Sequence, residues 1–359
     1  MTIAIILLII LLTMAFFYLK CKLTTSLTTL ITIVLATIAA FSYFETAAQF
    51  LISRGYGGGW AMPGAFVVIF MFVFALLRSG ADYLVGSEID LGKPAQTAAA
   101  VVCGLLGGIL FAGNVLVVLG MMPVQHKLLY NRFPADSPIV PANPQAPALA
   151  VDDWVAGFYG LVSRGALASK TSFSVLHADF VNTNHINRHG LGRDIPTIAG
   201  RDSVVAPPKA KTPIRLFTFA DKGTVAVVRV GLSMRSIADG GAAETGPLAF
   251  FLGQLRLICK QDGQQDNLLG KGQAVWPKGI VKNGALIEKR LEEMVNTDTE
   301  AVGERNRVLW LDVAFSLPSG QAPAAIQFRQ NAWANLTGYR PTPTSPEIEQ
   351  ALNEMLKEE

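Results

Sequence analysis

The stretch AVVCGLLGGILFAGNVLVVLG, residues 100–120, decides how the first third of this chain folds. It carries no charge, and it is long enough to cross a bilayer, for which about 20 apolar residues are needed. Helices in lipid associate largely through close backbone contact, which small side chains permit. Small residues fall on one face of this segment, because they recur at every fourth position: Ala100, Gly104, Gly108 and Ala112.

We interpret this face as a docking surface for another helix. The alternative is that glycine is simply common in membrane helices. Asn114 lies in the same segment, and its side chain is able to hydrogen-bond to a neighbouring helix.

Three further apolar segments precede this one, and together they predict a four-helix transmembrane domain over residues 1–122. The four segments cover residues 3–19, 27–44, 61–77 and 95–121. Residues 1–122 hold only five of the 30 basic and four of the 27 acidic residues, so the rest of the chain has the composition of a soluble protein. The net charge of +3, without a basic run, predicts no nucleic-acid partner.

The first segment predicts a retained helix rather than a signal peptide, because it has no positive N-terminal region and no small-residue cleavage site before Lys20. Lys20 and Lys22 follow this helix, which places them in the cytoplasm by the positive-inside rule. Four crossings then put both chain ends outside. Lys127 and Arg132 favour the opposite orientation.

The order of these features resembles the colicin V production protein family of bacterial inner-membrane proteins, over residues 1–122. The similar stretches are RGYGGGWAMPGAFVVIFMFVFALLR (54–78) and EIDLGKPAQTAAAVVCGLLGGILFAG (88–113). The first helix departs from the family pattern, because it lacks an aspartate and is followed by LKCKL (19–23). The resemblance implies a role in colicin V production or export and in envelope maintenance, and it supplies no catalytic residues.

Residues 123–150 predict a proline-rich linker, with FPADSPIVPANPQAPA (133–148) as an extended spacer. A soluble β-rich domain is expected over residues 151–340. Its first element is an amphipathic helix that Asp152 or Asp153 caps, with an apolar face formed by Trp154, Phe158 and Leu161.

Alternating apolar residues predict an antiparallel, sandwich-like fold for this domain. IRLFTF and TVAVVRVGLS form a predicted hairpin, and GALIEKRLEEMVN (284–296) reads as a helix between strands. The other predicted strands are LAFFLGQLRLIC (248–259), RVLWLDVAFSLP (307–318) and AAIQFRQNAW (324–333).

The sequence predicts no enzyme and no cofactor. His177, His185 and His189 are weak metal-ligand candidates, because their spacing matches no known site and their surroundings are rich in loop-forming asparagine. The motifs GxSxG, HExxH, CxxC and GxGxxG are absent from the chain.

SPEIEQALNEMLKEE, residues 345–359, predicts a C-terminal amphipathic helix with one apolar stripe. It is too short to be stable alone in water, so we expect it to dock either on the β-rich domain or on a partner or second copy.

The sequence therefore predicts an inner-membrane protein that lies in the lipid bilayer and acts through a protein partner or as a homo-oligomer. A first alternative is an oligomeric transport or channel component. A second is an envelope enzyme that uses the histidine segment.

The positive-inside assignment makes a testable prediction about orientation. A C-terminal alkaline phosphatase fusion should be active and a C-terminal fluorescent fusion dark, because both chain ends are expected outside the cytoplasm. An inactive phosphatase fusion together with a bright fluorescent fusion would show that the C-terminus lies in the cytoplasm.

Overall fold

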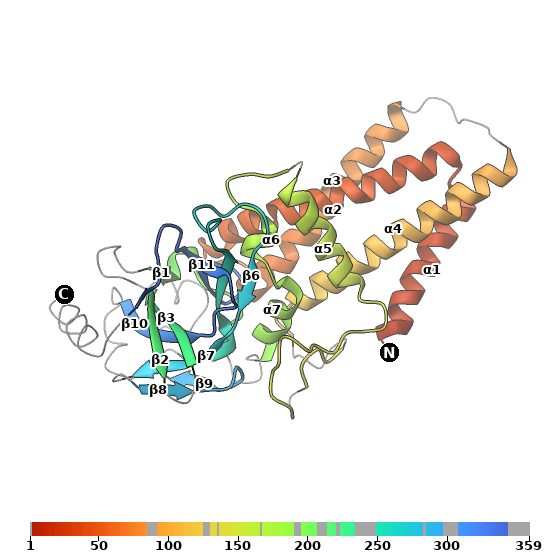
Figure 1. The fold of residues 1–359 in the computed structure, drawn as a ribbon. Coiled ribbons are helices and arrows are strands. Elements are labelled where there is room, and N and C mark those ends of the chain that lie inside the picture. Colours follow the sequence, from red (N-terminus) through yellow and green to blue (C-terminus); the bar gives the residue numbers. More distant parts are fainter. Residues whose placement is uncertain are drawn as a thin grey trace. The chain divides into compact units, whose positions relative to one another are not determined.

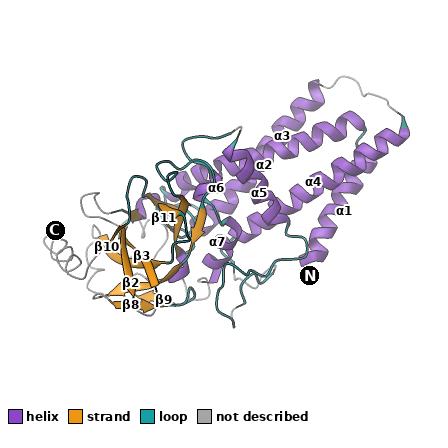
Figure 2. Cartoon of the chain, in the orientation of Figure 1, coloured by secondary structure: helices purple, strands orange, loops and turns teal. Residues whose placement is uncertain are grey.

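The computed structural model describes most of the chain. The described residues are 2–84, 92–124, 130–134, 136–165, 167–189, 195–206, 214–219, 223–233, 249–282, 285–296 and 308–343. They form two compact units, each considered separately below. Unit 1 comprises Met1–Arg132 and Gln145–Tyr159, and unit 2 comprises Phe133–Pro144 and Gly160–Glu359. Helices dominate the first unit and strands the second (Figure 2).

Four long apolar helices build unit 1, as the hydropathy pattern predicts. They are α1 (Thr2–Lys20), α2 (Leu23–Ile52), α3 (Ala61–Leu84) and α4 (Lys93–Met121), with a short 3-10 turn, η1 (Gly58–Trp60), before α3. Each is long and apolar enough to cross a membrane. α1 packs on α4, α4 on α2, and α2 on α3 (Figure 1). α2 and α4 are therefore the central helices, and α1 and α3 lie at the two edges.

Helix α5 (Val151–Arg164) differs from the prediction in both its cap and its buried face. Because it begins at Val151, Asp152 and Asp153 lie inside its first turn rather than at the N-cap. The predicted apolar face is wrong, since Trp154 is 50% and Leu161 63% exposed. The buried face consists of Val151, Val155 and Tyr159.

The surroundings of α5 explain the difference. Tyr159 stacks on the Phe41 ring of α2, with a centroid separation of 4.9 Å, and its hydroxyl hydrogen-bonds to Ser42 at 2.8 Å. α5 is not wholly part of the β-rich domain, because the division between the units falls after Tyr159.

The predicted extended spacer does not hold for residues 133–144, which belong to unit 2. Phe133 and Ile139 are buried there in a small apolar core with Ile186 and Leu291. The Asn182 amide also donates to the Pro141 carbonyl at 3.1 Å. The two large apolar side chains of this segment gain free energy by leaving water, which explains why it packs on unit 2.

Unit 2 begins with α6 (Phe173–Leu176), α7 (Phe180–Asn187) and the 3-10 turn η3 (Arg201–Ser203). Its strands are β1 (Val204–Val205), β2 (Ile214–Phe219), β3 (Gly223–Ser233), β4 (Ala249–Phe251), β5 (Leu255–Gln261), β6 (Gln273–Val275), β7 (Pro277–Lys282), β8 (Ala285–Glu288), β9 (Met294–Asn296), β10 (Val308–Phe315), β11 (Gln321–Phe328), β12 (Ala332–Asn335) and β13 (Thr342–Pro343).

Three sheets form from these strands, and nearly all pairs are antiparallel. The largest has the order β13-β2-β3-β10-β7-β8, with β1 paired to β3; the second is β12-β11-β5-β6, and the third is β4-β9. Only the short β13–β2 pair is parallel among the described strands. Side chains from all three sheets meet in one core, for example Val230, Leu257 and Phe250.

The register confirms the predicted hairpin of β2 and β3, in which Phe219 lies opposite Gly223. The predicted strand over residues 248–259 divides into β4 and β5, because the 3-10 turn η5 (Leu252–Gln254) separates them and sends them to different sheets.

The helix predicted over residues 284–296 is wrong, because this segment forms β8 and β9. Pairing with β7 overrides the local helix pattern. Gly279 of β7 permits that pairing, since a Cβ there would overlap the Ile287 carbonyl oxygen. The C-terminal helix predicted over residues 345–359 lies outside the described residues.

An ion-pair cluster joins three neighbouring strands of the large sheet. Asp312 of β10 accepts two hydrogen bonds from Arg229 of β3, at 2.7 and 2.6 Å, and one from Arg215 of β2, at 2.6 Å. Burial raises the pKa of Asp312, but the hydrogen bonds and charges of Arg229 and Arg215 outweigh it and hold this pKa below its ordinary value. The carboxylate compensates charge that is almost wholly buried, since Arg215 is 2% exposed.

Asp312→Asn should destabilise unit 2 by about 3 kcal/mol, because it leaves buried guanidinium charge without this carboxylate. Denaturant unfolding of the full chain measures the loss. The wild-type contribution should be complete above the ordinary carboxyl pKa of about 4 and disappear as the pH falls through the lowered value.

Asp266→Asn is the matched control, since Asp266 forms an exposed ion pair with Arg340 and should contribute less than about 1 kcal/mol. Equal losses for the two variants would contradict the role assigned to Asp312.

Candidate functional site

The small-residue face of α4 lies against α1 within unit 1. A Cβ added at Gly104 would stand 3.0 Å from the Met14 Cα, and one at Gly108 would stand 3.0 Å from the Ile10 Cα. Such distances are shorter than nine in ten ordinary Cβ contacts, so any larger residue would force the neighbouring helix to shift. The flanking Ala100 and Ala112 are 2% and 0% exposed. The two backbones therefore approach more closely here than larger side chains would allow.

Asn114 links α4 to α2. Its amide nitrogen donates to the Thr37 hydroxyl at 2.7 Å, and this hydroxyl in turn donates to the Ile33 carbonyl at 2.8 Å. Both side chains are buried. All five residues singled out by the sequence are thus buried inside unit 1, and a different surface of this unit is open.

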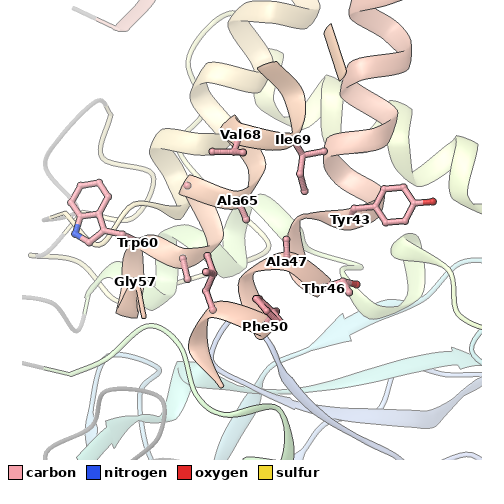
Figure 3. A pocket seen from close by; sticks show the side chains of 12 residues that line it. Tyr43, Thr46, Ala47, Phe50, Gly57, Trp60, Ala65, Val68 and Ile69 are labelled. Carbon is pink, nitrogen blue, oxygen red and sulfur yellow. The ribbon is translucent and has the colours of Figure 1, made fainter. Parts of the chain in front are cut away.

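That surface is an apolar groove of about 740 Å³ between α2 and the edge helix α3 (Figure 3). Small residues form its floor. It is lined by Tyr43, Ala47 and Phe50 of α2 and by Ala61, Gly64, Ala65 and Val68 of α3, with Gly57 and Trp60 before α3. The Tyr43 and Trp60 side chains extend outward on opposite sides (Figure 3), and they are 63% and 53% exposed.

Gly64 has no packing role within the described part of the bundle. A Cβ at this position would meet no atom within 4 Å, in contrast to Gly104 and Gly108. Val68, one turn further along α3, is 66% exposed. Ala61, Gly64, Ala65 and Val68 lie at helical spacing on one face of α3. Ala61 and Ala65 are buried, at 2% and 6% exposed, whereas Gly64 and Val68 are open.

A smaller cavity of about 370 Å³ lies among all four helices. Aromatic side chains dominate its lining, including Phe16 of α1, Phe70 and Phe74 of α3, and Phe111 of α4. Both spaces are apolar, so they suit aliphatic or aromatic side chains and acyl chains rather than ions.

A polar cluster fixes the start of α5. The Tyr130 hydroxyl donates to Asp152, and Arg132 forms a bidentate pair with Asp153 at 3.0 and 3.1 Å. Burial raises the pKa of Asp152 more than the Tyr130 hydrogen bond lowers it. Sequence reasoning missed this cluster, because Tyr130 and Arg132 lie in the predicted linker.

The three candidate histidines occupy different surroundings. His177 lies between the rings of Phe173 and Phe180, His185 is buried in α7, and His189 stands beside Phe133. No group of three or more potential metal-ligating His, Cys, Asp or Glu side chains occurs among the described residues.

Comparison with known proteins identifies no relative. No family model matches the chain, and neither a curated protein nor a solved structure is similar to it.

The α1–α4 contact makes a prediction about stability. Gly108→Leu should lower the melting temperature of the detergent-solubilised protein, because the new side chain forces α1 away from α4 at a cost of about 1–3 kcal/mol. Membrane insertion should survive, since leucine is favoured in lipid.

Gly80→Leu in α3 is the control, because a Cβ there meets no atom within 4 Å. If the Gly108→Leu variant keeps the wild-type melting temperature, the close approach of α1 and α4 contributes nothing to stability.

Proposed function

We propose that this chain is a multi-pass protein of the bacterial inner membrane that acts by binding other membrane-embedded chains. Four helices of membrane-spanning length and hydropathy support the integral-membrane part of the proposal. The resemblance of residues 1–122 to the colicin V production family supports the inner membrane and a role in envelope maintenance or toxin production and secretion. In this proposal the β-rich region lies outside the cytoplasm, as the positions of Lys20 and Lys22 favour.

The open face of α3 at Gly64 and Val68 carries the proposal. Glycine within a helix costs about 1 kcal/mol relative to alanine in water, so a glycine that packs against nothing in its own bundle calls for an explanation. Small residues on a lipid-facing helix allow another helix to approach closely, and van der Waals packing then drives association. Gly64 provides such a position at the edge of the bundle, next to the exposed Val68 and to the buried Ala61 and Ala65.

A second copy of the chain is the occupant that we propose for this groove. Two α3 helices related by a twofold axis would place the same face of each against the other, which is the commonest arrangement of soluble oligomers and needs no further partner. Val68 of one copy would then fill the space above Gly64 of the other.

The apolar lining favours this proposal over the channel alternative. An ion path needs polar or charged groups that face water inside the bundle. The buried hydroxyls of Thr29, Thr32 and Thr37 instead donate to carbonyls of their own helix. Both described cavities are lined almost wholly by apolar side chains.

Gly64→Leu tests the proposal. Leucine would occupy the groove of its own chain, so the purified variant should remain folded but shift from dimer to monomer when its mass in detergent is measured by light scattering. Gly80→Leu, on the same helix and equally unhindered, should dimerise like the wild type.

A wild-type protein that stays monomeric at every concentration would contradict the proposal, and so would a Gly64→Leu variant that remains dimeric. A monomer that retains lipid in the groove would indicate an acyl-chain site instead.

A further inference from the structure

Arg329 occupies an unusual position at the tip of the β11–β12 hairpin in unit 2. Phe328 pairs with Ala332, so residues 329–331 form the tip. Arg329 has a φ of 54°, in the left-handed region that glycine and asparagine normally occupy. It is the only described non-glycine residue with a positive φ. Its side chain is 0% exposed. A strained backbone that holds a fully buried cation is typical of a functional position.

The hydrogen bonds of Arg329 leave one edge of its guanidinium unused. The backbone N–H donates to the Gln254 carbonyl at 2.7 Å, and Nη1 donates to the Ile198 carbonyl at 2.9 Å. The guanidinium also lies over the Phe328 ring, 4.8 Å from its centroid. Nε and Nη2 are buried and make no hydrogen bond. These two nitrogens carry parallel N–H groups, which is the edge that binds a carboxylate through two hydrogen bonds.

The charge of Arg329 also lacks compensation. Burial alone lowers its pKa to about 9, and no acidic group in the described part of the chain opposes that effect. Arg215, which is also buried, differs from Arg329 because it pairs with the Asp312 carboxylate. Desolvating an unpaired charge is costly, so a counter-ion at this edge would stabilise the fold.

Neutral polar groups around the tip have unused hydrogen-bonding capacity as well. The Gln330 amide nitrogen and oxygen, the Thr197 hydroxyl and the Gln254 side-chain oxygen are all buried without hydrogen bonds. Backbone contacts hold these segments together, because Gln330 N–H donates to the Thr197 carbonyl at 3.1 Å. The Gln254 amide donates to the Pro196 carbonyl at 2.9 Å. Buried polar atoms in native proteins usually have partners, including bound water or ions.

We propose that the free Nε–Nη2 edge of Arg329 binds the carboxylate of a small monoanion, enclosed between the β11–β12 tip and residues 196–199. A carboxylate matches the planar edge, and a single negative charge neutralises one guanidinium, whereas a dianion such as phosphate leaves excess charge in the interior. The ligand is small, because Arg329 and Gln330 are 0% and 4% exposed. The Gln330 amide and Thr197 hydroxyl are donors for its remaining lone pairs. Water would satisfy the hydrogen bonds but not the charge.

Acetate is the probe for this site. The full chain in detergent is equilibrated at pH 7 with increasing sodium acetate, with sodium chloride replaced mole for mole, and its thermal unfolding is followed. Acetate should raise the melting temperature by about 2 °C or more at saturating concentration, because a ligand that binds only the folded state stabilises it. Saturation transfer from the protein to the acetate methyl group reports binding directly.

Variants assign the effect to Arg329. Arg329→Met should lose both the temperature rise and the saturation transfer. Arg329→Lys keeps the charge but lacks the two-pronged edge, so acetate should bind it at least about tenfold more weakly. Arg340→Gln, which alters an exposed arginine, should respond like the wild type.

Two results would overturn the proposal. The first is a wild-type protein that does not distinguish acetate from chloride, which needs no variant to interpret. The second is an equal acetate response in Arg329→Lys or Arg329→Met. An equal rise with phosphate would contradict the assignment to a carboxylate.

Discussion

The close approach of α1 and α4 is the contact on which the membrane-like unit depends. Gly104 and Gly108 let the two backbones approach so closely that an added Cβ at either position would lie only 3.0 Å from a Cα of α1. Because this face is used inside the bundle, it is unavailable to other chains, and α2 then takes its place between α4 and α3. α3 stands at an edge of the bundle, and its face is open at Gly64 and Val68. The proposed interaction surface follows from the way the first face is filled.

The sequence predicts the membrane-like helices well and the packing faces poorly. Continuous apolar runs identify α1–α4, because a helix that crosses a membrane is surrounded by apolar lipid along its whole length. For α5 the local pattern selects Trp154 and Leu161, but the surface beside it buries Val155 and Tyr159. Residues 285–288 likewise form a strand because they pair with β7, the strand that contains Gly279. The sequence signal for the α3 groove was the small residues Ala61, Gly64 and Ala65, yet only the structure shows that Ala61 and Ala65 are buried and Gly64 is open. Arg329 depends on contacts with Ile198 and Gln254, which no local pattern reveals.

Two buried arginines of unit 2, Arg215 and Arg329, differ in whether an acidic side chain pairs with them. Asp312 pairs with both Arg215 and Arg229 through three short hydrogen bonds. Among the described residues Arg329 contacts an aromatic face and one carbonyl but no acid, which is why we propose that a ligand completes this site. The contrast suggests that the β-rich unit has a binding role of its own, separate from the helix contacts proposed for the membrane.

The central claim is that α3, and not α1 or α4, provides the contact between copies. Disulfide cross-linking in native membranes tests it most directly, after Cys21, Cys103 and Cys259 are replaced by serine. A single cysteine from Val68→Cys on α3 should give a cross-linked dimer, and one from Leu8→Cys, 56% exposed on the outer face of α1, should not. Cross-linking through Leu8→Cys, or none through Val68→Cys, would contradict the account.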